Sequence, residues 1–225
     1  MKKLLIFDAY GTLLSTGSGS VDAVRKILAL QPQAIDPAAF YARWKQLHRR
    51  HMDICNQGDF LPEEELFALD LAALYEEYHI RRPYREDVLF MLQSLTGRSV
   101  FPDAAEALPQ LMATHRVVIG STTDTQPLLK NLADNALHPH AVYTSEDIRK
   151  YKPAPEFYRH ILAREGVAPG DALFIGDSLR DDVLGPQQVG IATVWVNRRN
   201  VSLRPTDPQP DHIVHSIKEI AELPL

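Results

Sequence analysis

Four short apolar runs in this sequence each lead into side chains that could take part in catalysis. The runs end at or shortly before Asp8, Ser121, Lys152 and the acid pair Asp177 and Asp182. In an open parallel sheet, ligands bind beyond the carboxyl ends of the strands, so these side chains are expected to meet at one edge. An acid, a hydroxyl, a cation and an acid pair would rarely gather there by chance.

The three carboxylates predict a metal site. If Asp8, Asp177 and Asp182 lie within a few ångströms, they repel one another and at least one takes up a proton. A hard divalent cation with oxygen ligands removes that repulsion, and Mg²⁺ is the expected ion. Lys152 adds positive charge, so Asp8 could attack an anionic substrate and form an ester that water then splits. Ser121 and backbone amides would hold the outer oxygens of the substrate.

In this order the motifs resemble the haloacid dehalogenase-like hydrolase superfamily, over nearly the whole chain. The family's motifs match Asp8 to Thr12, Ser121, Lys152-Pro153 and Gly176-Asp177 with Asp182. The resemblance implies an α/β core with a doubly wound parallel sheet, and a second, smaller all-helical cap inserted after the first motif. It also implies an aspartate nucleophile and, in the phosphatases, Mg²⁺.

Tyr10 departs from the phosphatase pattern, in which a second aspartate protonates the leaving alcohol. The dehalogenase branch of the family carries this same Asp-Ala-Tyr-Gly-Thr turn, because a departing halide needs no proton. Tyr158 falls where those dehalogenases place an active-site tyrosine, and Arg43 could match their halide-binding arginine. However, the dehalogenases follow Ser121 with asparagine, where this chain has Thr122, and they lack the acids of the fourth motif.

Three functions therefore stay open. The retained acids favour a magnesium-dependent phosphatase of a small phosphorylated metabolite, acting through an aspartyl-phosphate. The alternative is a metal-independent L-2-haloacid dehalogenase with an aspartyl ester, and the third possibility is a non-catalytic binding protein. The expected site residues can be listed by role. They are catalytic Asp8, Tyr10, Ser121 and Lys152; substrate-binding Thr12, Thr122, Arg43 and Tyr158; and metal-binding Asp8, Tyr10, Asp177 and Asp182.

The elements that must position these residues follow from the apolar pattern. Short buried runs predict strands at Leu4–Phe7, Arg116–Gly120, Ala141–Thr144, Ala172–Gly176 and Ile191–Val196, with helices near 103–113, 126–136, 155–165 and 180–189. Such alternation predicts a parallel sheet covered on both faces. Apolar spacing is helical throughout residues 17–97. We therefore predict an α/β core of residues 1–16 and 98–225 and a cap of residues 17–97, with a last strand or helix after 204–210.

The amino-acid composition restricts the kinds of binding partner and the cellular location that we expect. The chain has 225 residues, 45% of them hydrophobic, and a formal net charge of −5. The net negative charge gives no reason to expect nucleic acid or an anionic membrane as a partner. A single cysteine fits a reducing cytoplasm, and no run approaches the roughly 20 apolar residues of a membrane span. We expect a cytoplasmic monomer or homodimer with a small anionic substrate. The stretch HRRHMD at 48–53 is interpreted as a solvated helix face.

Overall fold

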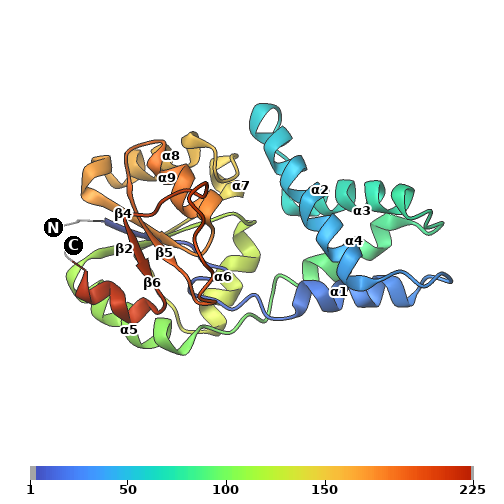
Figure 1. The fold of residues 1–225 in the computed structure, drawn as a ribbon, viewed down its shortest axis with the longest axis horizontal. Coiled ribbons are helices and arrows are strands. Elements are labelled where there is room, and N and C mark those ends of the chain that lie inside the picture. The colour runs from blue at the N-terminus through green and yellow to red at the C-terminus, as the bar shows by residue number, and fades with distance from the viewer. Residues whose placement is uncertain (1–3, 224–225) are drawn as a thin grey trace.

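A six-stranded parallel sheet forms the centre of the larger part of the molecule (Figure 1). The computed structural model describes residues 4–223. The strands follow the order β3-β2-β1-β4-β5-β6, and every pairing is parallel. Their bounds are β1 Leu4–Phe7, β2 Arg116–Ser121, β3 Ala141–Thr144, β4 Ala172–Gly176, β5 Ala192–Val196 and β6 His212–Val214. The predicted doubly wound α/β sheet is confirmed.

The direction in which strands are added reverses at β1. The chain builds β2 and β3 on one side of β1 and then β4, β5 and β6 on the other. A reversal of this kind leaves a crevice beyond the carboxyl ends of the central strands. The residues that follow β1, β2 and β4 therefore surround one crevice.

Helical layers cover both faces of the sheet because its central strands are apolar on both sides. Successive side chains of a strand point to opposite faces. The odd-numbered residues of β1 pack in one cluster with α5, α6 and η3, and the even-numbered residues pack with α8. The bounds are α5 Pro102–Thr114, α6 Thr125–Asp134, α7 Ser145–Ile148, α8 Pro155–Glu165, η1 Pro169–Asp171 and η3 Ile217–Glu222.

Four helices form a second unit with its own apolar cluster, which lies beyond the sheet in Figure 1. They are α1 Gly19–Ala29, α2 Pro37–Gln57, α3 Glu63–Glu77 and α4 Tyr84–Gln93. We call this unit the cap. Asp36 begins α2, since its carboxylate accepts from the Ala38 and Ala39 N–H groups at 3.2 and 3.1 Å.

The interpretation of residues 48–53 as a solvated helix face is wrong at its two histidines. The buried carboxylate of Asp70, on α3, accepts from Trp44 Nε1 at 2.9 Å and lies 2.7 and 2.6 Å from Nδ1 of His48 and of His51. Both imidazoles are half-buried as a result. The sequence spacing gave no sign of Asp70 because it lies on another helix.

The two segments that join the cap to the sheet lie side by side. Ser15 N donates to Ser99 O at 2.8 Å, and Phe101 N donates to Leu13 O at 2.9 Å. The cap is thus attached through one pair of neighbouring chain segments. The boundaries proposed at 16/17 and 97/98 stay a prediction.

The predicted helix at 180–189 takes another form. It is a π-helical turn, η2 Leu179–Leu184, followed by the short helix α9 Gly185–Gln187. In this turn the Asp182 carboxylate folds back and accepts from Ser178 N at 2.9 Å. Strand β2 extends one residue beyond the prediction, to Ser121, and β5 begins one residue later, at Ala192. A strand and a helical turn, β6 and η3, both follow residues 204–210.

No helix among residues 4–223 combines the length and the apolar character needed to cross a membrane.

Candidate active site

The central strands bring the first and fourth motifs together. Asp8 directly follows β1, and its N–H donates to the Ile175 carbonyl of β4 at 2.8 Å. Asp177 directly follows β4, and Asp182 lies in η2. Carboxylate oxygens of Asp8, Asp177 and Asp182 all lie within 4.8 Å of one another. Three of the four predicted metal ligands therefore form one cluster of oxygen donors.

Lys152 stands between two of these acids. Its Nζ donates to Asp8 Oδ1 at 2.8 Å, to Asp182 Oδ1 at 2.7 Å and to the Gly120 carbonyl at 3.2 Å. Burial opposes the charge of the ammonium group, but the carboxylates of Asp182 and Asp8 outweigh it and raise the pKa of Lys152. The lysine is therefore a fixed positive charge beside Asp8, the predicted nucleophile.

One lysine does not neutralise three clustered acids, of which Asp8 and Asp182 are buried and Asp177 is partly buried. Burial, together with the charge of Asp182, raises the pKa of Asp8 to about 6 even though Lys152 acts in the opposite direction. Burial and the charges of Asp8 and Asp182 raise the pKa of Asp177 to about 8. The second oxygen of Asp8, Oδ2, is buried and accepts no hydrogen bond from the residues described. A hard cation with oxygen ligands fits this donor set, and Mg²⁺ is such a cation.

Two glycines allow the acids to come this close. Gly11 has φ +91°, and a Cβ added there would lie 2.5 Å from Asp177 Oδ2. A Cβ on Gly176 would lie 2.3 Å from the carboxylate of Asp182. Any side chain at either position would push an acid out of the cluster.

Three hydroxyl groups add to the polar lining predicted for the substrate. The side-chain oxygens of Thr12, Ser121 and Thr122 are buried and have no hydrogen-bond partner within residues 4–223. Buried hydroxyls normally find a partner, and the side chain of Thr12 lowers the pKa of Asp8. The roles of Thr12, Ser121 and Thr122 toward a substrate stay predictions. Ser121 ends β2, whose neighbour β1 ends at Asp8.

The Tyr10 hydroxyl points to α6. It accepts from Asn131 Nδ2 at 3.0 Å, and the same Asn131 group donates to the Leu95 carbonyl at 2.7 Å. Burial is the chief cause that raises the pKa of Tyr10 to about 12. The phenol is thus a poor proton donor near neutral pH. Its assignment as a metal ligand stays a prediction.

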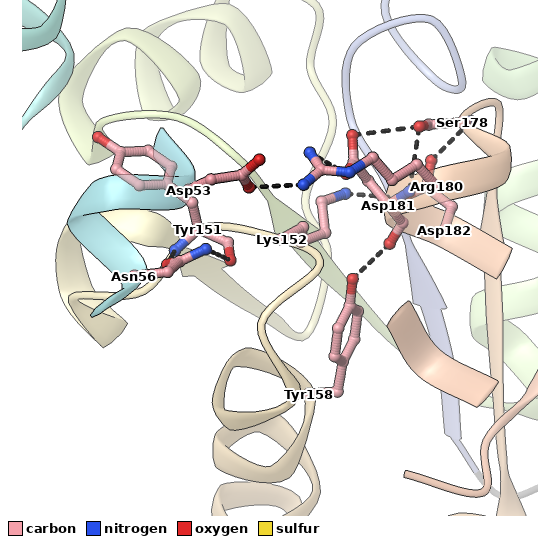
Figure 2. A network of polar contacts seen from close by, with 9 residues as sticks. All are labelled: Asp53, Asn56, Tyr151, Lys152, Tyr158, Ser178, Arg180, Asp181 and Asp182. Carbon is pink, nitrogen blue, oxygen red and sulfur yellow. Dashed lines mark hydrogen bonds and ion pairs between the residues drawn. The ribbon is translucent and has the colours of Figure 1, made fainter. Parts of the chain in front are cut away.

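Tyr158, on α8, contacts the η2 turn. Its buried hydroxyl donates to the Asp181 carbonyl (Figure 2), and its ring packs edge-on against Phe174 at 5.4 Å. Arg43 lies within the cap, where its Nε donates to Glu77 at 2.8 Å. The structure brings neither residue into a hydrogen bond with Asp8, and their roles in substrate binding stay predictions.

A reciprocal contact between cap and core lies beside the second motif. Glu63, the first residue of α3, accepts at Oε2 from Thr123 Oγ1 at 2.7 Å and from Asp124 N at 2.9 Å. In return, the Asp124 carboxylate accepts from Glu63 N at 3.1 and 3.0 Å. Sequence reasoning missed this group, because acids in the first turn of a helix are common and 60 positions separate Glu63 from Thr123.

A second cap contact lies on the lysine side of the site (Figure 2). Asp53 of α2 pairs with Arg180 of η2 at 2.5 Å. Asn56, one helical turn further, donates to the Tyr151 carbonyl at 3.0 Å and accepts from Tyr151 N at 2.8 Å. These contacts hold α2 against the residue that precedes Lys152.

A cavity of about 370 Å³, lined by both polar and apolar side chains, opens beside Asp177. Trp195, Arg198 and Arg199 contribute to its walls. The charge of Arg199 lowers the pKa of Asp177, against the larger effect of burial. The cavity gives an anion room next to the acid cluster.

Comparisons with known proteins agree with this geometry. A sequence model of the family "haloacid dehalogenase-like hydrolase" matches residues 2–190. Human N-acylneuraminate-9-phosphatase is 28% identical over 147 residues, which cover 63% of this chain and 59% of that protein. (S)-2-haloacid dehalogenase 4A from Burkholderia cepacia is 27% identical over 97% of this chain and 91% of that protein.

Solved structures support the same fold. The HAD-hydrolase YfnB from Bacillus subtilis, crystallised bound to magnesium, superposes with a TM-score of 0.75 at 21% identity and covers 98% of this chain and 97% of that one. Both phosphatases and dehalogenases are therefore among its relatives. From the family match, the acid cluster and the shared fold, we conclude that this chain belongs to the haloacid dehalogenase-like hydrolase family.

Proposed function

We propose that the protein is a magnesium-dependent phosphatase of a small phosphorylated metabolite. The observation that carries this proposal is the cluster of Asp8, Asp177 and Asp182, whose oxygens lie within 4.8 Å of one another beside Lys152. Phosphoryl transfer depends on such positive charge, because the transferred group is itself anionic. Carbon–halogen displacement gains little from a metal site.

In this proposal the acids of the first and fourth motifs hold the ion. Asp8, Asp177 and Asp182 would bind Mg²⁺, which supplies positive charge to the phosphoryl oxygens when bound. An Asp8 oxygen attacks phosphorus, so that the new Asp8 O–P bond forms while the bond to the leaving oxygen breaks. Lys152 keeps Asp8 ionised and faces the incoming anion.

Two hydroxyl groups stabilise the first step, in which the phosphoryl group is transferred to Asp8. Ser121 and Thr122 donate to the outer oxygens of the phosphoryl group, whose charge grows during transfer. Water then attacks the aspartyl-phosphate, releases phosphate and restores the Asp8 carboxylate.

The second candidate is a metal-independent L-2-haloacid dehalogenase. Tyr10 favours it, because a tyrosine in that position provides no acid for a leaving alcohol and a halide requires none. The similarity to dehalogenase 4A over nearly the whole chain favours it as well. The acid pair Asp177 and Asp182 weighs against it, since Lys152 alone does not offset the effects that raise the pKa of Asp177 to about 8.

One experiment separates the two candidates. Purified protein is assayed for phosphate release from a panel of phosphate esters and for chloride release from 2-chloropropionate, each with Mg²⁺ and with EDTA. The phosphatase proposal expects phosphate release that needs Mg²⁺ and is lost in Asp8→Asn. Chloride release that EDTA leaves unchanged would overturn it in favour of the dehalogenase.

A further inference from the structure

The proposed phosphatase reaction lacks a proton donor in the core. A departing alkoxide needs a proton, and the position that would supply it holds Tyr10, whose hydroxyl is bonded to Asn131. Asp8, Asp177 and Asp182 belong to the ion cluster. The cap is the next element that could supply a donor, because its helix α3 contacts the core two residues after Ser121.

Glu63 is the cap carboxyl group that the fold brings to this edge. The residue is only 6% exposed. Its Oε2 accepts both cross-domain hydrogen bonds, from Thr123 Oγ1 and Asp124 N. Both of these bonds go to Oε2, so one oxygen is fixed by the core and Oε1 is left to carry the proton.

Three neighbours locate Glu63 relative to the reacting groups. Thr123, which it binds, lies two residues after Ser121. Burial is the chief cause of the raised pKa of Tyr10, which lies two residues after Asp8, and the charge of Glu63 raises it further. After burial, its charge is also the chief cause of the raised pKa of Tyr151, which directly precedes Lys152. Glu63 thus lies among the residues that flank the nucleophile, the hydroxyl and the lysine.

We propose that Glu63 is the general acid of this enzyme, supplied by the cap in the role that Tyr10 cannot fill. This inference rests on the proposed phosphatase function. Protonated Glu63 gives its proton to the leaving oxygen as the bond from phosphorus to that oxygen breaks, and an alcohol departs. The ionised Glu63 then takes a proton from the water that attacks the aspartyl-phosphate, which returns it to its starting form.

The surroundings of Glu63 suit a group that exchanges protons near neutral pH. Burial raises the pKa of Glu63 to about 7, and the charge of Asp124 on α6 acts in the same direction. The hydrogen bonds from Asp124 N and Thr123, and His48 on α2, lower it. The charge of Glu63 acts in turn on the phenols of Tyr10 and Tyr151 and raises the pKa of each. Such a pKa near the working pH is what general acid catalysis requires.

The test compares leaving groups in Glu63→Gln. An alkyl phosphate releases a basic alkoxide that needs a proton, whereas p-nitrophenyl phosphate releases a phenolate that does not. For the variant we expect kcat/KM to fall about 100-fold or more with the alkyl ester and less than about 5-fold with p-nitrophenyl phosphate. The fall of alkyl kcat/KM above pH 7 in the wild type should be absent in the variant. Glutamine retains an oxygen that accepts from Thr123 and Asp124, so the cap contact persists.

Asp124→Asn is the matched control. It weakens the same cap contact and leaves the Glu63 carboxyl group in place. Because the loss of the Asp124 charge also lowers the pKa of Glu63, the two esters are compared at the pH optimum of each variant, where both should be affected equally. If Glu63→Gln also lowers both esters equally, or lowers neither, Glu63 is not the acid and the inference is overturned. Such a result would leave the phosphatase function intact. Absence of phosphate release from every ester with Mg²⁺, in a folded wild-type protein, would overturn both.

Discussion

Lys152 Nζ lies 2.8 Å from Asp8 Oδ1, although 144 positions separate the two residues in the chain. The same ammonium lies 2.7 Å from Asp182 Oδ1. One buried cation therefore holds Asp8, the proposed nucleophile, and an acid of the fourth motif in place. Its removal has consequences for both catalysis and stability.

In Lys152→Met we expect phosphatase activity to fall by more than about 1000-fold, since the variant loses a fixed charge at the nucleophile. Loss of the lysine also leaves buried acids unpaired, which costs about 3 kcal/mol of unfolding free energy in EDTA. Urea denaturation measures this cost, and Mg²⁺ should restore part of it. Lys150→Met is the control, since Lys150 Nζ donates to the Asn56 carbonyl instead. A variant as stable as the wild type in EDTA would contradict the expected role.

Asp177 should control the response to metal. A ligand at 100 times its Kd stabilises the folded state by about 2.7 kcal/mol. For a chain of this size, Mg²⁺ should thus raise the Tm of the wild type by roughly 5–10 °C. We expect no such rise in Asp177→Asn. Asp181→Asn serves as the neighbouring control and should keep the response, because Asp181 lies outside the cluster of Asp8, Asp177 and Asp182.

Gly11→Ala tests how closely the loop after β1 passes Asp177. A Cβ at Gly11 would lie 2.5 Å from the Asp177 carboxylate, and φ there is +91°. The variant should lose the Tm response to Mg²⁺ as well as stability. Gly97→Ala separates the two effects, since Gly97 also has positive φ, +71°, but no atom lies within 4 Å of its added Cβ. We expect Gly97→Ala to cost about 1 kcal/mol and to keep the response.

The Tyr10→Phe variant tests whether the phenol takes part in catalysis. The variant loses the acceptor for Asn131 Nδ2, and this costs about 1 kcal/mol of unfolding free energy. Because the hydroxyl is bonded to α6 and its pKa is about 12, kcat should change by less than about 5-fold. A loss of two orders of magnitude in kcat would show instead that the phenol acts on the substrate.

Glu63 should make stability depend on pH. Its pKa rises from 4.5 in the unfolded chain to about 7 in the folded protein, so the folded state binds the proton more tightly. The stabilisation that this gives is complete below pH 4.5 and is lost as the pH rises through 7. Glu63→Gln does not titrate, so its stability relative to the wild type should rise by roughly 3 kcal/mol over this window. Urea denaturation of both proteins between pH 5 and 8 measures the difference, and parallel pH profiles would contradict it.

The acid cluster could be predicted from the sequence because strand ends of a parallel sheet share one edge. Asp8, Ser121 and Asp177 each end a short apolar run, and the neighbours of β1 are fixed by the fold class. Asp182 was found by its motif alone, since the regular helix expected around it is a π-helical turn.

The cap contacts could not be predicted in this way. The pairs Glu63 with Asp124 and Asp53 with Arg180 depend on how one unit is oriented on the other. Local periodicity carries no information about that orientation. The same limit applies to Tyr10, because its position in the first motif predicts a catalytic role but not the hydrogen bond that its hydroxyl accepts from Asn131.

The attachment of the cap through two neighbouring segments has an evolutionary consequence. Ser15 and Ser99 are hydrogen-bonded at the junction, so the chain leaves the sheet and returns to it at nearly the same point. A different helical bundle could be grafted between them without disturbing the nucleophile or the ion ligands. Substrate choice could then diverge by exchange of the insert while the bond-breaking apparatus is inherited unchanged, and the transplanted bundle would have to bring its own acid.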